Sequence, residues 1–310
     1  MPKELTHWWL AAEAVRRLPL DRPTRHLLEE QQAAYLVGAV LPDTLPHLLR
    51  EPHSTMAARL TDAFHDSRMH SYNPLLACIA GTPDLSPEQQ ACLLGIATHI
   101  ETDIVFHPFV YAQAGSNRGC HYRVETDLDL WLLQHHPHPP ADELRELLFH
   151  DHYDSVFKAA ASVLSCVFDP RGLLPPEAVE EALQQHALLQ ARYNSPGWKL
   201  LIRLLGLFPG TRYRQWQHLF YPLRGHRGRP VCWPERWQHP VSGVERGDTP
   251  EGLLTEAITR ITALLRGVDD LGLTTALRRQ PGENLLTGLS VQPPAGSYEP
   301  KSAGSMSAHN

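Results

Sequence analysis

The sequence predicts an all-α fold, a multi-helix bundle of about nine or ten helices. Apolar residues recur at helical spacing along most of the 310 residues, and no stretch alternates convincingly between polar and apolar residues as a half-buried strand does. Helix start signals also recur, with Ser, Thr or Pro placed ahead of apolar stretches. One such stretch is apolar nearly all round, which is typical of a helix at the centre of a bundle.

The elements that precede this central helix are predicted from periodicity and from the Pro and Gly residues that interrupt it. Pro19 stops the first helix, and the loop Gly38–Asp43 ends the second. Gly81, followed by Thr and Pro, closes the fourth. These four helices are expected at residues 5–18, 23–39, 53–65 and 71–80.

The central helix has the clearest start signal in the chain. Ser86, Pro87 and Gln89 stand in the order of a capping box with Pro in the first turn. The following segment, 91–100, is apolar on nearly every side, so this helix is expected to be buried.

The second half of the chain continues the bundle and then changes character. Residues 205–247 are rich in Pro, Gly, Arg and Trp and show little periodicity. Beyond residue 280 the chain is polar and rich in Pro, Gly and Ser, as disordered segments are. The remaining helices are expected at 121–134, 141–149, 151–167, 176–193 and 249–267.

Composition excludes some classes of protein. A net charge of -6 argues against a general nucleic-acid coat. The 5 Cys include no C-x-x-C pair, and an odd number is more typical of reduced thiols than of a disulfide framework. No apolar run approaches the roughly 18 residues that span a bilayer. The segment Met1–Trp9 lacks a continuous apolar signal core, so we expect a cytoplasmic protein.

The most informative pattern is a stripe of metal-ligating side chains on the central helix. His99, Asp103 and His107 are four residues apart, so they lie nearly above one another. His121 and Glu125 repeat that spacing on the next helix. Charged groups on a buried helix are costly unless something pairs with them, and a metal ion would do so. Imidazole and carboxylate donors without thiolate are typical of a hydrolytic zinc site.

Chance weighs against the isolated pairs. The composition predicts about two His-x-x-x-Asp/Glu pairs at random, and the chain contains six, so a single pair is weak evidence. The linked triple followed by a second pair is much harder to obtain by chance. The competing interpretation of these residues is a set of hydrogen-bonded core histidines.

Further polar residues precede the stripe in suggestive places. His7 stands just before Trp8, where it could instead pack against an aromatic core. Asp43 follows Pro42 in a loop, where it could instead cap the next turn. His65 and His70 flank a short polar segment.

This order of residues resembles the zinc-dependent phospholipase C family, over about residues 5–135. The shared pattern is an early His, a Pro-Asp loop, a middle His, and then two motifs. His99–Val110 is similar to H-x-x-x-D-x-x-x-H-P-[YF]-[VI] of a bacterial branch of the family, and His121–Asp129 to its H-x-x-x-E-x-x-x-D. The resemblance implies the helical fold that the family shares with P1/S1 nucleases.

The resemblance also implies roles for these residues and two or three Zn²⁺ ions. His99 and Asp103 would hold a central metal, with Asp103 bridging to a neighbouring ion. His107, His121 and Glu125 would hold a second metal. The other implied ligands are His7 in a third site, Asp43, which would also orient or deprotonate the attacking water, and a middle His matched by His70 or else by His65.

The function implied is zinc-dependent hydrolysis of a phosphodiester, of the phospholipase C type, on a phospholipid or similar substrate. The first alternative is a P1/S1-type nuclease, although no nucleic-acid partner is expected at this net charge. The second is a non-catalytic helical protein whose metal site is structural or vestigial. The sequence does not indicate an oligomeric state.

The Arg/Trp-rich segment allows two interpretations. Residues 201–240 contain seven Arg and one Glu among several aromatic residues. Such a segment could make a peripheral contact with anionic phospholipid, or it could pack its aromatic residues on the bundle. We favour packing, and divide the chain into a helical metal-binding catalytic domain (1–204), an Arg/Trp-rich wrap with a C-terminal helix on the same domain (205–270), and a disordered tail (281–310).

Overall fold

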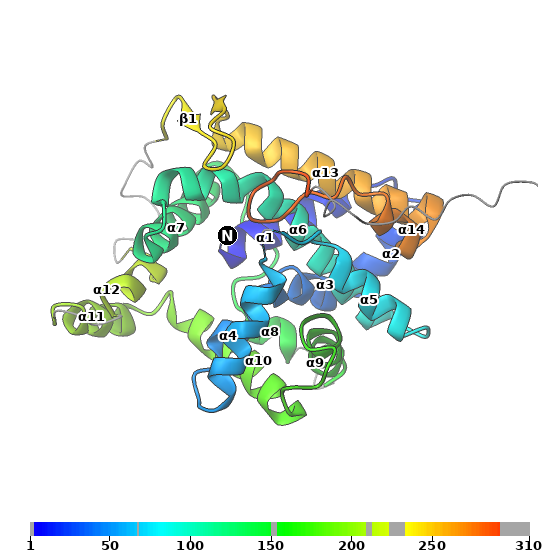
Figure 1. The fold of residues 1–310 in the computed structure, drawn as a ribbon, viewed down its shortest axis with the longest axis horizontal. Helices are drawn as coiled ribbons and strands as arrows, with labels where there is room; N and C mark the ends of the chain where they lie inside the picture. Colours follow the sequence, from blue (N-terminus) through cyan, green and yellow to red (C-terminus); the bar gives the residue numbers. More distant parts are fainter. Residues whose placement is uncertain (1–2, 67, 150–153, 209–212, 223–232, 292–310) are drawn as a thin grey trace, which may run out of the picture.

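The computed structural model describes residues 3–66, 68–149, 154–208, 213–222 and 233–291. The fold is all-α, as the sequence predicts (Figure 1). The helices are α1 (Glu4–Arg16), α2 (Pro23–Glu30), α3 (Gln32–Gly38), α4 (His53–Phe64), α5 (Asn73–Gly81), α6 (Pro87–Ala114), α7 (Arg118–His135), α8 (Leu144–Leu148), α9 (Ser155–Phe168), α10 (Pro176–Arg192), α11 (Pro196–Leu205), α12 (Tyr213–Trp216), α13 (Pro250–Leu271) and α14 (Leu273–Arg278). Short 3-10 turns are η1 (Leu41–Asp43), η2 (Leu45–His47) and η4 (Gln217–Leu219), and the strands are β1 (Trp237–Gln238) and β2 (Glu245–Arg246).

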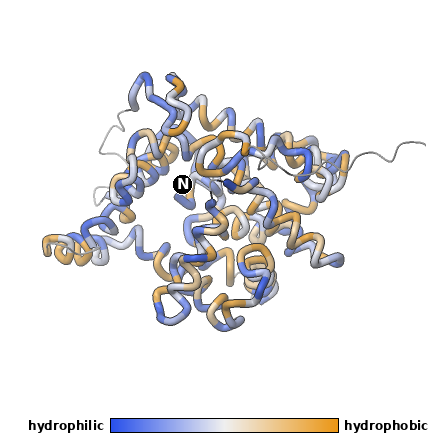
Figure 2. Tube along the Cα trace, viewed as in Figure 1, coloured by the Kyte–Doolittle hydropathy of each residue, from blue (hydrophilic) through white to orange (hydrophobic). Residues whose placement is uncertain are grey.

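Helix α6 is the central element, and the other helices are arranged around it. Its N-terminus has the predicted capping box, in which Gln89 N donates to Ser86 Oγ and Ser86 N donates to Gln89 Oε1. Every residue from Ala91 to Val110 is buried. Figure 1 shows α13 along one side of α6 and α8, α9 and α10 on the other. Along the outer helices, polar and apolar stretches alternate, as one buried face requires (Figure 2).

Helices α3 and α6 cross unusually closely, and two glycines allow it. A Cβ atom at Gly38 would lie 2.1 Å from the Cys92 carbonyl oxygen, and one at Gly95 would lie 2.2 Å from the Tyr35 carbonyl oxygen. Both distances are far below van der Waals contact, so only glycine fits at either position. The close crossing brings the loop after α3, which carries Asp43, directly against the side of α6.

The expected helix over 23–39 is two helices in the structure. Gln31 has φ -106° and ψ 35°, which lies outside the helical region, and it separates α2 from α3. The central helix continues through Pro108 to Ala114. Within 205–247, the described residues include α12, η4 and the antiparallel pair of β1 and β2.

Part of the C-terminal tail that we expected to be disordered is structured. Residues 281–291, called the strap here, lie against α6 and the loop before α5. Leu285 and Asn284 are buried, so polar composition alone misjudged this segment. Residues 292–310 lie outside the described residues.

The expectation of reduced thiols is wrong for two of the cysteines. Cys78 of α5 and Cys166 of α9 form a disulfide, with Cα atoms 5.3 Å apart. Because these residues are 88 positions apart, the sequence showed no pairing motif. Cys232 lies outside the described residues.

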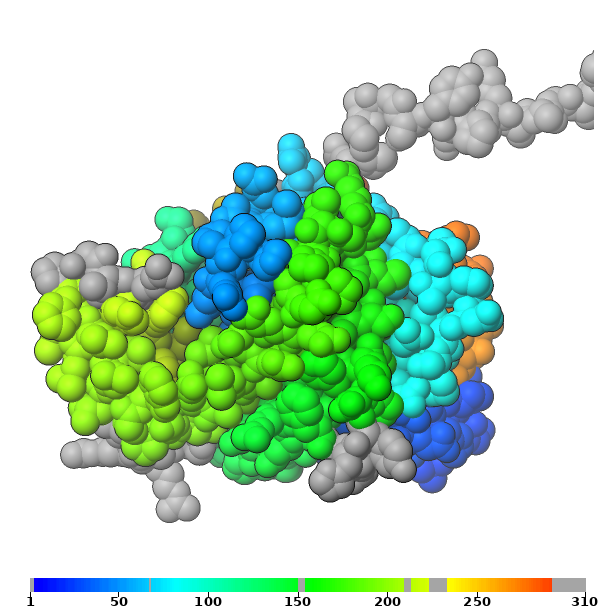
Figure 3. Space-filling view, turned by 90° about the horizontal axis from the view of Figure 1, so that it is seen from below, coloured from blue at the N-terminus to red at the C-terminus, as the bar shows by residue number. Residues whose placement is uncertain are grey.

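The underside of the molecule is a continuous surface. In Figure 3 the blue atoms of α4 adjoin the green atoms of α9 and α10, in agreement with the packing of α4 on α9. Among the described residues, no helix is long and apolar enough to cross a bilayer.

We expect Gly95→Ala to lower the free energy of unfolding by about 2–3 kcal/mol, because the new methyl group forces α3 and α6 apart. The matched control is Gly81→Ala at the end of α5, where a Cβ atom would meet nothing within 4 Å. Urea denaturation followed by circular dichroism measures both changes. Equal effects of the two substitutions would contradict the importance of the close crossing.

Candidate metal centre

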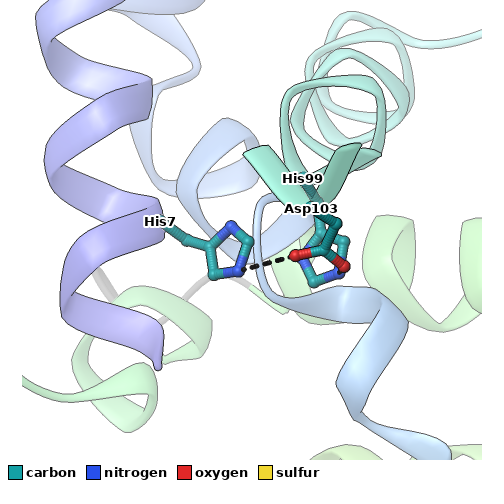
Figure 4. Close-up of side chains that lie close together, drawn as sticks. All are labelled: His7, His99 and Asp103. Carbon is teal, nitrogen blue, oxygen red and sulfur yellow. Dashed lines mark ion pairs between the residues drawn. The ribbon is translucent and has the colours of Figure 1, made fainter. Parts of the chain in front are cut away.

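Three buried side chains meet where α1 passes the middle of α6 (Figure 4). His7 Nε2 lies 3.6 Å from Asp103 Oδ1, and His99 Nε2 lies 3.0 Å from Asp103 Oδ2. The His7 and His99 rings are stacked, with centroids 4.3 Å apart. Ligands in a tetrahedral zinc site lie roughly 3.4 Å from one another, given Zn–N distances of about 2.0–2.1 Å. The three side chains therefore have the spacing of a metal site.

The orientation of His99 is fixed by the main chain of the loop after α3. His99 Nδ1 lies 2.8 Å from the Ala39 carbonyl oxygen, so Nδ1 carries the proton and donates it. Nε2 then has a lone pair directed toward Asp103, which is the usual arrangement of a zinc-bound histidine. The pKa of His99 is raised: burial alone would lower it, but the Asp103 carboxylate more than offsets that effect.

A second group of ligand-type side chains joins α6 to α7. His121 Nε2 lies 2.6 Å from Glu125 Oε1, and the ring centroids of His107 and His121 are 6.2 Å apart. His107 Nδ1 lies 2.6 Å from the Leu285 carbonyl oxygen of the strap, which leaves Nε2 for a metal. Burial lowers the pKa of His107 well below its usual value, which favours the neutral imidazole that metals bind.

Asp103 connects the two groups. Its Oδ2 atom lies 3.0 Å from His99 Nε2 and 3.8 Å from His107 Nδ1, while Oδ1 faces His7. The side chain is fully buried. Asp103 faces Nε2 of both His7 and His99, whereas the His107 nitrogen nearest to it is the Nδ1 that donates to Leu285. The bridging role that the family resemblance implies for Asp103 stays a prediction.

Asp43 lies between the two groups, at the end of η1. Its carboxyl interacts electrostatically with His99, Asp103 and Glu125. The Oδ1 atom is buried and accepts no hydrogen bond from any described residue. Burial raises the pKa of Asp43 to about 7. The positive charge of His99 lowers this pKa, and the negative charge of Asp103 adds to the rise. Several buried carboxylates so close together are unfavourable unless a cation joins them.

The structure separates the two candidates for the middle histidine. Burial lowers the pKa of His65, which also interacts electrostatically with Asp103 and His99. His65 Nδ1 is bound to the Thr61 carbonyl oxygen, so Nε2 is left for a metal. His70 instead faces the strap, where a Cβ atom at Gly282 would lie 3.2 Å from its ring. His65 is therefore the better-placed ligand, although motif order favoured His70.

A family comparison agrees with this geometry. The model of a family described as zinc dependent phospholipase C matches residues 6–166, which is just over half of the chain. The chain belongs to this family. The comparisons with curated proteins and with solved structures found no match.

The residues present fit the zinc that this family binds. All the candidate donors are imidazole nitrogens or carboxylate oxygens, which suits catalytic zinc. The imidazoles of His65, His99 and His107 each donate Nδ1–H to a main-chain carbonyl oxygen. The Nε2 atom of each ring is therefore left for a metal. The candidate ligands are His7 from α1, Asp43 from η1, His65 from the end of α4, His99, Asp103 and His107 from α6, and His121 and Glu125 from α7.

The strap supports His107 and the segment that follows His65, and the sequence does not predict this support. The Asn284 side-chain amide donates to the carbonyl oxygens of Asp66 and Met69, at 2.9 and 3.0 Å. These bonds hold the segment that follows His65, while the next carbonyl, that of Leu285, orients His107. Every residue has a main-chain carbonyl group, so residue type does not reveal which one accepts a hydrogen bond from His107. The sequence signal for this contact is the apolar pair Leu285–Leu286 within an otherwise polar segment.

Asp129 anchors the helix that carries His7. Its Oδ1 atom accepts hydrogen bonds from Thr6 N at 3.0 Å and Thr6 Oγ1 at 2.5 Å, and its Oδ2 atom accepts one from the Tyr221 hydroxyl at 2.6 Å. The first N–H groups of a helix lack partners within it, so Asp129 of α7 serves as the N-terminal acceptor of α1. The last acidic position of the family-like motif is thus a support of His7.

The Asp43 loop is held by a polar cluster of its own. His47 Nδ1 lies 2.9 Å from the Asp43 carbonyl oxygen, and Thr44 Oγ1 lies 3.0 Å from His186 Nδ1. His186 Nε2 in turn lies 3.7 Å from Glu4 Oε1. These contacts tie η1 and η2 to α10 and α1, which fixes the direction of the Asp43 side chain.

A cavity of about 290 Å³ opens beside the second group of ligands. It lies between the end of α6 and the start of α7, and its lining includes Tyr111, Arg118, His121 and Tyr122. Arg118 is exposed at its rim. A cation there would attract an anionic group toward His121.

We expect zinc removal to destabilise the protein. Zinc at a hundredfold excess over its Kd stabilises the folded state by about 2.7 kcal/mol per site, so chelation should lower Tm measurably. Elemental analysis of protein purified without a histidine tag should find bound zinc that falls in Asp103→Asn and in Glu125→Ala. Asp62→Asn, an exposed position on α4, is the matched control. Absence of zinc after reconstitution would contradict the metal centre.

The middle ligand has its own test. We expect His65→Ala to lower bound zinc per chain and His70→Ala to leave it unchanged, because only His65 interacts with Asp103 and His99. Elemental analysis after equilibrium dialysis distinguishes the two variants. The reverse result would restore His70 as the ligand.

Proposed function

We propose that this protein is a zinc-dependent phosphodiester hydrolase of the phospholipase C type, acting on a phospholipid. The observation that carries the proposal is the buried group of His7, His99 and Asp103, which has the spacing of a metal site. A cavity that includes Arg118 lies beside the neighbouring candidate ligand His121. Family membership supports the chemistry. We further propose that the centre holds two or three ions, bound by the eight candidate ligands.

The metal centre and the chain's own residues divide the chemistry. Bound zinc would lower the pKa of water and stabilise negative charge on the phosphoryl oxygens in the transition state. Asp43 orients the water that attacks phosphorus and accepts its proton, since its Oδ1 atom accepts no hydrogen bond from the described residues. A bond forms between the water oxygen and phosphorus while the ester P–O bond breaks, and the leaving alkoxide takes up a proton from solvent to become the alcohol. Arg118 at the cavity rim draws the anionic diester toward the centre.

Product identity separates the lipid substrate from the nuclease alternative. A phospholipase C reaction on phosphatidylcholine yields diacylglycerol and phosphocholine. Screening phospholipids, single-stranded DNA and RNA with zinc-loaded protein distinguishes the two substrate classes. Preferential cleavage of nucleic acid would overturn the lipid proposal and keep the hydrolase.

We expect Asp43→Asn to lower kcat on the best phosphodiester by at least about 100-fold, because the amide cannot accept the proton. The fold should be retained by circular dichroism. Unchanged zinc content and Tm would assign the loss to proton transfer, and a fall in both would assign it to metal binding. Asp62→Asn again serves as the control. Wild-type turnover by Asp43→Asn would rule out Asp43 as the base.

A further inference from the structure

Helix α11 exposes an apolar face. Leu200, Leu201 and Leu204 are 55%, 43% and 51% exposed, and Leu207 just after the helix is 77% exposed. On a helix the first three positions lie on one side. We call these four leucines the leucine face. Exposed apolar residues in such a cluster, unlike scattered ones, mark an interaction surface.

The side of α11 opposite the leucine face packs against the protein, so the leucine face points away from the molecule. Ile202 and Lys199 are buried, and α11 packs on α12 and η4. Figure 1 shows α11 and α12 projecting at one end of the molecule. Figure 2 colours much of this end as apolar, and Figure 3 shows it at the surface.

Charge indicates what the leucine face contacts. Residues 182–234 contain eight Lys or Arg and no Asp or Glu, in a protein of net charge -6. Arg203 is exposed on the same side of α11 as Leu200 and Leu207. Arg214 is exposed on α12, against the packed side of α11 at Gly206, and the Arg192 guanidinium stacks 4.4 Å from the Trp198 ring centroid. Exposed aliphatic residues flanked by cations and an aromatic ring are typical of a helix that lies in a lipid interface.

The same charge argues against a second copy of this chain as the occupant. In a two-fold dimer, the same patch from each subunit faces itself. The leucine faces would then meet with their basic surroundings opposed, and like charges would repel. An anionic lipid surface satisfies both the apolar and the cationic groups.

Helices α12 and α7 connect the leucine face with the candidate active site. Helix α12, on which α11 packs, contacts α7, the helix that carries His121 and Glu125. The contact lies at Gly119, where a Cβ atom would be 3.5 Å from Gln215 Cα, between the cavity-lining residues Arg118 and His121. A surface bound at α11 is therefore held close to the cavity.

We propose that α11 docks this protein on an anionic phospholipid bilayer, with the leucine face entering the boundary between head groups and acyl chains. The proposal rests on the proposed function only in supplying a reason for docking, namely delivery of a phospholipid to the cavity. Binding itself requires no turnover.

The test is sedimentation with vesicles. Wild-type protein should pellet with vesicles of phosphatidylcholine and phosphatidylglycerol, less with phosphatidylcholine alone, and less at high salt. Leu201→Asp/Leu204→Asp should reduce partitioning at least about tenfold, and Arg203→Gln about fivefold on anionic vesicles only. The matched control is Leu20→Asp/Leu49→Asp, at leucines 73% and 54% exposed elsewhere on the surface. Equal binding by wild type and the α11 double variant would overturn the proposal.

Two measurements separate this proposal from its rivals. Light scattering that shows a dimer converted to a monomer by Leu201→Asp/Leu204→Asp would assign the leucine face to a second copy and overturn lipid docking. Hydrolysis of a monomeric short-chain phospholipid should be unchanged in the double variant, since the face is outside the cavity. Vesicle binding without hydrolysis of any lipid would retain docking and reject the proposed function.

Discussion

The burial of the Asp103 carboxylate constrains everything around it. A carboxylate with no exposed surface in the middle of the central helix is tolerable only if positive charge reaches it. His7, His99 and His107 surround it within 3.0–3.8 Å, and the elements that carry or orient these rings must meet α6 at fixed positions. The glycine contact between α3 and α6 meets this requirement on one side, because it places the Ala39 carbonyl oxygen where it orients His99.

The candidate ligands come from separate parts of the chain, and several of them are held by contacts distant in sequence. Asp129 holds the start of α1 for His7, the strap holds His107 and the segment after His65, and the cluster around His186 holds the Asp43 loop. None of these supports is itself a candidate ligand. Their common effect is to fix the ligands before a metal arrives, so that little conformational entropy is lost on binding.

The parts of this arrangement that the sequence predicts are local ones. Capping at Ser86, burial of 91–100 and the stripe from His99 to His107 depend on residues within a few turns of one helix, and the structure has all three. The break at Gln31, the Cys78–Cys166 disulfide and the strap depend on tertiary contacts that periodicity cannot register. The choice between His65 and His70 as the middle ligand stays a prediction, since the two residues are close in sequence and motif order does not register that His70 lies against the strap.

Charge links the site with the leucine face. Without metal, Asp43, Asp103 and Glu125 are three carboxylates at the candidate site, so when ionised they would repel the anionic phosphodiester that we propose as substrate. Two Zn²⁺ ions would change the sum of these charges from -3 to about +1, which turns repulsion into attraction. The basic segment 182–234 acts in the same direction, since it carries +8 while the rest of the chain carries -14. An anionic surface of the kind proposed above would attract the α11 end of the molecule, where the described residues Lys199, Arg203 and Arg214 lie. Helix α12 of that end contacts α7, whose first residues line the cavity.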